Sequence, residues 1–198
     1  MNPLFYFKNP RFFFPRIKYF IWEKMNPDKP WLCKEAVEFC DKNLRNDMKG
    51  IEFGSGRSTI WFAKKLSSLV SIEHDPHWHS LIDQKIKISK ISNIDYKLIP
   101  LNHPESEGEK NQYQKDPDYL SILKDFVDEY FDFIVIDGHY RTNAIRLSIS
   151  KIKRGGFFLV DDVNFWGDFK DVPVPKNWKI VSQSTNGIKK TGIWKVTK

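Results

Sequence analysis

Acidic side chains stand where several apolar segments of this sequence end, and these residues could carry chemistry. The acids that follow an apolar run of strand length are Glu73, Asp137, Asp161 and Asp162. A carboxylate at such a position can accept hydrogen bonds from hydroxyl groups, take up a proton, or bind a divalent cation. Each acid taken singly could simply cap a turn or a helix. Their shared position at strand ends is therefore what indicates a ligand site.

A glycine turn lies close to the first of these acids in the predicted fold. It is formed by Glu52, Phe53, Gly54, Ser55, Gly56, Arg57, Ser58 and Thr59. Its two glycines let the backbone turn tightly and approach a ligand. Glu73 is placed to accept hydrogen bonds from the ribose hydroxyls of an adenosine ligand. Because Glu52 would repel a pyrophosphate but attract a cationic amino group, we predict a nucleotide cofactor with a positively charged end.

The elements that must position these residues alternate between strand and helix from Trp31 onward. Predicted strands cover residues 50–53, 69–73, 96–99, 133–136, 157–160, 178–183 and 192–196, with a turn at Asn186 and Gly187 between the last two. Predicted helices cover residues 32–44, 58–66, 76–86, 119–130 and 141–151, with Asp75 as the N-cap of the third and Gly155 and Gly156 ending the fifth. Such alternation is typical of a parallel sheet with helices on its faces. We expect one domain over residues 31–198, with the carboxyl ends of its parallel strands at one edge.

The first thirty residues have a composition of their own. Aromatic residues such as Phe5, Phe12 and Trp22 are interleaved there with Lys8, Arg11, Arg16 and Lys18, and Pro3, Pro10 and Pro15 interrupt any continuous helix. No apolar run in this segment is long enough to span a membrane. Two interpretations of residues 1–30 stay open: a cap over the substrate cleft, or a peripheral contact with anionic lipid. The polar stretch 102–118 is a candidate lid.

A resemblance to a known family rests on three of these motifs. The run from Glu52 to Thr59, Glu73 after its apolar strand, and Asp137-Gly138 before Asp161-Asp162 resemble class I S-adenosylmethionine (SAM)-dependent methyltransferases. The resemblance implies a Rossmann-like three-layer α/β/α sandwich with a seven-stranded, mostly parallel sheet whose last strand is antiparallel. It implies SAM over the glycine turn, Glu73 on its ribose and His74 against its adenine. The implied cofactor-binding residues are Glu52, Phe53, Gly54, Ser55, Gly56, Ser58, Glu73, His74 and Asp137.

The acids after the fourth and fifth predicted strands resemble those of divalent-cation-dependent O-methyltransferases of small molecules and sugars. Asp137, Asp161 and Asp162 match the positions at which those enzymes hold a metal, here expected to be Mg²⁺, which would lower the pKa of an acceptor hydroxyl. The chain departs from the catechol type because it lacks the nearby lysine of those enzymes. A metal-free base, Asp137 or His139, is the alternative. The expected catalytic residues are Asp137, His139 and Asp161, and the expected substrate residues are Tyr140 and Arg141.

The resulting hypothesis is methyl transfer from SAM to an oxygen of a small-molecule acceptor, such as a sugar or a saccharide intermediate. A nicotinamide-dependent oxidoreductase is the first alternative, although Glu52 and the replacement of the third motif glycine by Thr59 count against it. The second alternative is a non-catalytic Rossmann-like module that docks on a membrane or a partner. The sequence does not indicate an oligomeric state.

Composition narrows the expected partners and location. The net charge of +7 is spread along the chain, which is typical of an ordinary lysine-rich surface. We expect no nucleic-acid partner, because Gly138 and His139 follow Asp137 where nucleobase amino methyltransferases carry two prolines. Cys33 and Cys40 offer no disulfide framework, which favours a location in the cytoplasm. A peripheral contact with a membrane is the alternative location.

Overall fold

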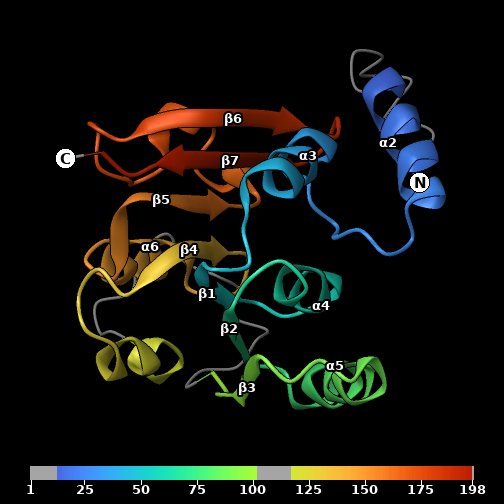
Figure 1. Cartoon of the computed structure of the whole chain (residues 1–198). Coiled ribbons are helices and arrows are strands. Elements are labelled where there is room, and N and C mark those ends of the chain that lie inside the picture. Colours follow the sequence, from blue (N-terminus) through green and yellow to red (C-terminus); the bar gives the residue numbers. More distant parts are fainter. Residues whose placement is uncertain (1–12, 102–116, 198) are drawn as a thin grey trace.

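A seven-stranded sheet forms the centre of the computed structural model, which describes residues 13–101 and 117–197 (Figure 1). Its strands are β1 (Lys49–Phe53), β2 (Ser68–Glu73), β3 (Ile94–Leu98), β4 (Phe131–Ile136), β5 (Ile152–Val160), β6 (Lys179–Thr185) and β7 (Lys190–Lys195). They are ordered β3-β2-β1-β4-β5-β7-β6. Strands β1 to β5 are mutually parallel, and β7 is antiparallel to both of its neighbours. The predicted mostly parallel sheet with an antiparallel last strand is confirmed.

Helices and short 3₁₀ segments surround the sheet. They are α2 (Phe13–Met25), α3 (Lys34–Asn43), α4 (Arg57–Ala63), α5 (Pro76–Ser89), η3 (Asp118–Asp125), α6 (Arg141–Ser148), η4 (Val163–Phe165) and η5 (Phe169–Asp171). Helix α5 begins as predicted, because the Asp75 carboxylate accepts a hydrogen bond from the Trp78 backbone N–H at 2.6 Å and thus caps the first turn. Cys33 directly precedes α3 and Cys40 lies within it, and both are buried free thiols.

Strand β4 shows why the fold has three layers. Successive side chains of a strand point to opposite faces, and every residue of β4 after Asp132 is apolar. Phe133 and Val135 belong to the core that contains residues of α3 and α4, whereas Ile134 and Ile136 belong to the core that contains residues of η3 and α6. A strand buried on both faces needs such a continuous apolar run. The predicted three-layer arrangement is therefore confirmed.

Two predicted helix boundaries are wrong. The segment predicted as a helix to Tyr130 forms the shorter η3, and Glu129, whose φ is 54°, turns the chain into β4. Gly155 and Gly156 do not end a helix but lie inside β5. A Cβ at Gly156 would stand 2.8 Å from the Asp132 carbonyl oxygen, so a glycine is needed where β5 approaches β4 this closely.

Helix α2 stands on the side of the sheet toward which β4, β5 and β6 run (Figure 1). The prediction that prolines prevent a helix here is wrong for Pro15, which lies in the first turn, where a backbone N–H has no helical acceptor to lose. The Tyr19 side chain is buried, and the Glu23 carboxylate lies 4.0 Å from the Arg57 guanidinium. The helix is thereby tied to Arg57, which follows the second glycine of the glycine turn.

Two predicted features fall largely outside the described residues. The first part of the aromatic segment, residues 1–12, and nearly all of the candidate lid, residues 102–116, are not described. Among residues 13–101 and 117–197, the structure contains no helix that is long and apolar enough to cross a membrane.

Candidate active site

The turn after β1 packs directly against the end of β4. Gly54 has a φ of 91°, and a Cβ at this position would stand 2.7 Å from the Gly138 nitrogen and 2.8 Å from the Asp137 carbonyl oxygen. Only glycine combines this backbone conformation with this approach. The Asp137 N–H in turn donates to the Phe53 carbonyl at 2.9 Å. The predicted cofactor turn and the predicted catalytic aspartate are thus in backbone contact.

Glu73 joins the turn to the start of α5. Its Oε2 accepts hydrogen bonds from the Ser55 N–H at 3.1 Å and the Ser55 hydroxyl at 2.7 Å. Its Oε1 accepts from the His74 and Asp75 N–H groups at 2.8 and 2.9 Å. Burial alone would raise the pKa of Glu73, but the hydrogen bonds from these residues outweigh it and lower the pKa to about 2. Glu73 is therefore a carboxylate at neutral pH.

Two residues that sequence reasoning missed complete this side of the site. The Trp78 indole N–H donates to the Ser55 carbonyl at 2.9 Å, and the Tyr96 hydroxyl lies 2.7 Å from the Ser55 hydroxyl. Both positions follow from the fold, because Trp78 is in the first turn of α5 and Tyr96 is on the strand next to β2. Trp78 and Tyr96 lie outside the glycine turn in sequence, and both stabilise its conformation through their hydrogen bonds with Ser55.

Aromatic rings gather between the ends of β2 and β4. The His74 ring lies 5.7 Å from the His139 ring and 5.9 Å from the Tyr119 ring, and the His139 ring lies 4.9 Å from the Tyr140 ring. The two histidines are half-buried, whereas both tyrosines are buried. The histidines are the rings of this group that a ligand can reach. Tyr140, predicted to contact substrate, instead lies in the core.

Glu52 lies beneath the turn with its side chain fully buried. Its Oε2 accepts hydrogen bonds from the Thr59 hydroxyl at 2.7 Å and the Ser71 hydroxyl at 2.9 Å, and the Thr59 hydroxyl accepts from the Gly56 N–H at 3.0 Å. Burial raises the pKa of Glu52 to about 7, although these hydroxyls and that of Ser58 oppose the shift. Phe53 and Ser58, also predicted to bind cofactor, have buried side chains as well.

The raised pKa of Glu52 predicts a stability that depends on pH. A group whose pKa rises from 4.5 to about 7 on folding stabilises the fold fully below its unfolded pKa and loses this contribution as pH rises through 7. The loss is on the order of 3 kcal/mol. Because Gln mimics the protonated acid, we expect Glu52→Gln to gain thermal stability relative to the wild type between pH 5 and pH 8, measured by thermal unfolding.

The matched control for this prediction is Glu38→Gln on the exposed surface of α3. Its unfolding temperature should follow that of the wild type across the same pH range. A pH dependence that is the same in Glu52→Gln and in the wild type would show that Glu52 does not titrate in this range.

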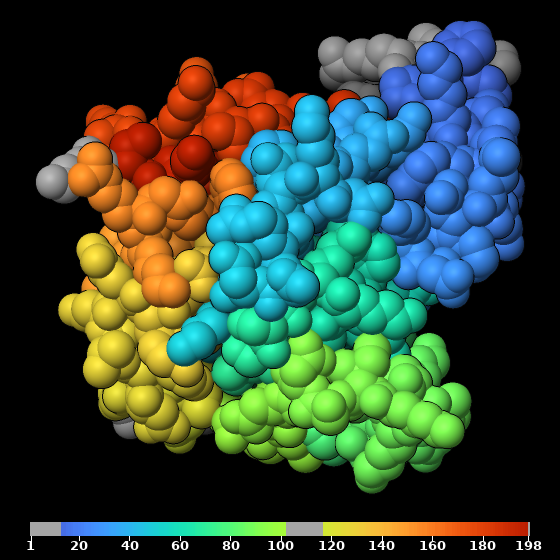
Figure 2. Space-filling view, viewed as in Figure 1, coloured from blue at the N-terminus to red at the C-terminus, as the bar shows by residue number. Residues whose placement is uncertain are grey.

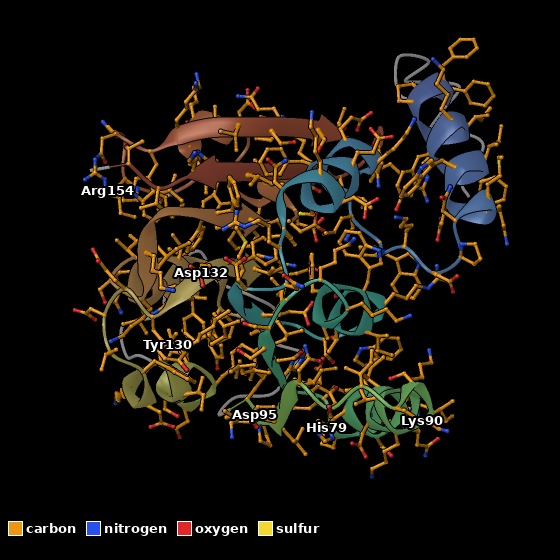
Figure 3. The ribbon with its side chains drawn as sticks, in the orientation of Figure 1. His79, Lys90, Asp95, Tyr130, Asp132 and Arg154 are labelled. Carbon is orange, nitrogen blue, oxygen red and sulfur yellow. The ribbon has the colours of Figure 1, made fainter. Side chains whose placement is uncertain are left out.

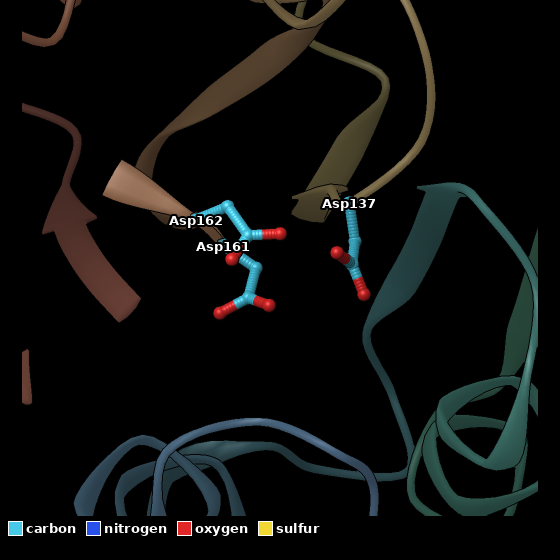
Figure 4. A group of neighbouring side chains, drawn as sticks. All are labelled: Asp137, Asp161 and Asp162. Carbon is cyan, nitrogen blue, oxygen red and sulfur yellow. The ribbon is translucent and has the colours of Figure 1, made fainter. Parts of the chain in front are cut away.

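Three carboxylates meet beyond the ends of β4 and β5 (Figure 4). One oxygen from each of Asp137, Asp161 and Asp162 lies within 4.8 Å of the others. The Arg141 guanidinium lies 3.5 Å from the Asp137 carboxylate and 3.3 Å from that of Asp162. The Lys189 ammonium lies 3.1 Å from Asp162 and 3.6 Å from Asp161. The structure therefore brings together all three predicted acids, and it balances most of their charge with two cations.

The protonation of this group is set by burial and by mutual repulsion. Burial and then the neighbouring Asp161 raise the pKa of Asp137 well above its usual range, while Arg141 and Lys189 oppose the shift. Burial and Asp162 likewise raise the pKa of Asp161. The three acids outweigh the effect of burial on Lys189 and raise its pKa, so Lys189 stays an ammonium. The raised pKa values make these carboxyl groups stronger proton acceptors than exposed carboxylates, as suits a general base.

Sequence reasoning missed two residues that contact these acids. Lys189 lies in the turn before β7, and Thr191 lies on β7. The Thr191 hydroxyl donates to the buried Asp161 carboxylate. Both residues arrive there because β7 is inserted antiparallel beside β5, with Gly192 opposite Val160. Lys189 belongs to the turn that begins at the predicted Asn186-Gly187 pair, since the Asn186 N–H donates to the Lys189 carbonyl at 3.1 Å. The turn could be predicted from the sequence, but the position of Lys189 beside the acids could not.

No protein-family model matches the sequence, and no curated protein matches it. Solved structures do match the fold. The candidate methyltransferase yhhF of Escherichia coli superposes with a TM-score of 0.62 at 12% identity, over 83% of this chain and 85% of that chain. An rRNA methylase of Streptococcus thermophilus gives 0.59 at 12% identity, over 83% and 95%. A candidate methyltransferase of Streptococcus mutans in complex with S-adenosylhomocysteine (SAH) gives 0.56 at 10% identity, over 81% and 95%.

These comparisons establish the class of fold. The chain has the Rossmann-like fold of class I SAM-dependent methyltransferases, as its sequence resemblance implied. The strand order distinguishes this sheet from that of the doubly wound dinucleotide fold. The latter has six parallel strands in the order 3-2-1-4-5-6, whereas here the antiparallel β7 separates β5 from β6.

Proposed function

We propose that this protein transfers the methyl group of SAM to an oxygen of a small-molecule acceptor. The observation that carries the proposal is the backbone contact between Gly54 and the Asp137-Gly138 peptide, which sets a cofactor turn beside a carboxylate suited to take a proton. The fold comparisons support a methyltransferase and argue against the oxidoreductase alternative. The choice of oxygen and of a saccharide-like acceptor rests on the strand-end acids.

The residues around the turn fit an adenosine ligand. Glu73 is ionised and buried, and its two oxygens already accept four hydrogen bonds from Ser55, His74 and Asp75, so ribose hydroxyls would bind it by replacing the Ser55 hydroxyl on Oε2. His74 and His139 offer half-buried ring faces for an adenine. We assign Glu52 to the support of the turn, because its side chain is buried behind Thr59. SAM, when bound, would supply an electrophilic methyl group.

Asp137 is the base we propose. It would take the proton of the acceptor hydroxyl, so that the oxygen gains the methyl group as the carbon–sulfur bond breaks and SAH leaves. Arg141, 3.5 Å from the Asp137 carboxylate, would bind a polar group of the acceptor and keep the carboxylate directed into the site. Lys189 would hold the Asp161 and Asp162 carboxylates in place through its ion pairs with both.

A divalent cation is the second way in which the same acids could act. The donor set of Asp137, Asp161 and Asp162 fits Mg²⁺, which prefers carboxylate oxygens. Bound there, the ion would act as a Lewis acid toward the acceptor hydroxyl. The ion pairs with Arg141 and Lys189 already supply two positive charges, so the metal-free route is the one we favour.

Calorimetric titration of SAM, SAH and NAD into the protein tests the cofactor. We expect SAM and SAH to bind and NAD not to bind. Glu73→Gln should weaken SAM binding about 10–100-fold, because a neutral amide replaces charge-assisted hydrogen bonds to the ribose hydroxyls. Glu38→Gln, an exposed substitution on α3, should leave the affinity unchanged. Binding of NAD would favour the oxidoreductase, and binding of none of the three would favour a non-catalytic module.

A further inference from the structure

Helix α2 carries an apolar stripe on its outer face in addition to the buried Tyr19. Its exposed large apolar side chains are those of Phe13, Phe14, Phe20, Ile21 and Met25. Among the described residues, no other helix or strand carries more than two such side chains. At about 100° per residue, the five positions fall within an arc of about 140°, and Tyr19 lies roughly opposite the centre of that arc. The helix therefore presents these five apolar side chains on the side opposite Tyr19.

The apolar side chains on this side of α2 are unusually exposed to water. The side chains of Phe14 and Met25 are 71% and 76% exposed, and that of Ile21 is 53% exposed. Contiguous apolar patches on a protein surface mark interaction sites more often than isolated apolar residues do. Figure 2 shows α2 at a corner of the molecule, next to α3. Phe14, Ile21 and Met25 line a groove there, which is also lined by Lys34 and Glu35 of α3.

Basic side chains border the apolar face. Lys24 lies within the arc, with its ammonium 5.7 Å from the Phe20 ring centre, and Arg16 and Lys18 lie at its two margins. The single acid of the helix, Glu23, faces the Arg57 guanidinium at 4.0 Å. Aromatic rings with flanking cations suit the boundary between water and an anionic lipid surface.

We propose that α2 docks on an anionic phospholipid bilayer. The helix lies in the plane of the interface with Phe14, Ile21 and Met25 among the acyl chains and Lys18 and Lys24 at the phosphate groups. Because α2 stands on the side toward which β4 and β5 run, docking brings the carboxyl edge of the sheet near the membrane. The proposal does not depend on methyl transfer.

Co-sedimentation of the full chain with vesicles tests it. The wild type should bind vesicles of phosphatidylcholine with phosphatidylglycerol at least about 10-fold more tightly than vesicles of phosphatidylcholine alone, and added salt should weaken this binding. The triple variant Phe14→Gln, Ile21→Gln, Met25→Gln should lose at least about 10-fold in affinity for the anionic vesicles. The matched control is Ile88→Gln with Val127→Gln, which removes two equally exposed apolar side chains elsewhere.

The control variant should bind like the wild type, and circular dichroism should show all three proteins equally folded. Equal loss in both variants, or equal binding to neutral and anionic vesicles, would overturn the proposal. So would a wild type that binds neither vesicle. If the wild type then proves dimeric by light scattering and the triple variant monomeric, the outer face of α2 is an interface between two copies of the chain.

Discussion

Replacing Asp137 with Asn should lower the rate of methyl transfer about 10²–10⁴-fold, the usual contribution of a positioned general base. Asn keeps the shape and the backbone hydrogen bond to Phe53 but cannot take the acceptor proton. In the wild type the rate should rise with pH as Asp137 loses its proton, with an apparent pKa above the usual carboxylate range because burial and Asp161 raise it. The measurement is transfer of labelled methyl from SAM to a panel of sugars and small alcohols.

Asp132, labelled in Figure 3, provides the control, because it lies near the start of β4, whereas Asp137 follows the end of this strand. Its carboxylate accepts from the Lys49 N–H at 2.9 Å and pairs with Lys153, far from the proposed reaction. Asp132→Asn should retain the wild-type rate. A chelator should leave the wild-type rate unchanged as well. Activity that disappears with the chelator and returns with Mg²⁺ would replace the base mechanism by the metal-dependent one.

The carboxylate group could be predicted from sequence because its chain positions carry a local signal. Asp137, Asp161 and Asp162 each follow an apolar run that only a buried strand explains, and parallel strands bring their carboxyl ends to one edge. Lys189 has no such signal of its own. Its place beside Asp162 depends on the insertion of β7 next to β5, a long-range pairing that local patterns do not determine.

Glu52 shows how a correct motif can leave a side chain's direction open. Side chains of a strand alternate between faces, and Ile51 and Phe53 both belong to the core on the η3 and α6 side. Glu52 must therefore point to the other face, toward α4, where Thr59 and Ser71 meet it. The alternation along the strand predicts this direction, whereas the charge of Glu52 by itself does not.

Replacing Gly54 with Ala should weaken SAM binding and lower the rate of methyl transfer about 100-fold, a loss typical of a displacement of about 1 Å in a catalytic site. An Ala at a positive φ costs about 1–2 kcal/mol by itself. At Gly54 the new Cβ would also stand 2.7–2.8 Å from backbone atoms of Asp137 and Gly138, so the turn and the end of β4 must separate. Calorimetry with SAM measures the affinity, and thermal unfolding measures the accompanying loss of stability.

Gly155→Ala separates the cost of backbone strain at a positive φ from the cost of the steric contact with Asp137 and Gly138. Gly155 also has a positive φ, 81°, but a Cβ there would meet no atom within 4 Å. This variant should lose about 1–2 kcal/mol of stability and bind SAM as the wild type does. If Gly54→Ala bound SAM equally well, the turn would tolerate separation from Asp137, and the backbone contact could not be what joins the cofactor to the base. A selective loss in Gly54→Ala would instead make that contact the structural basis of the proposed activity.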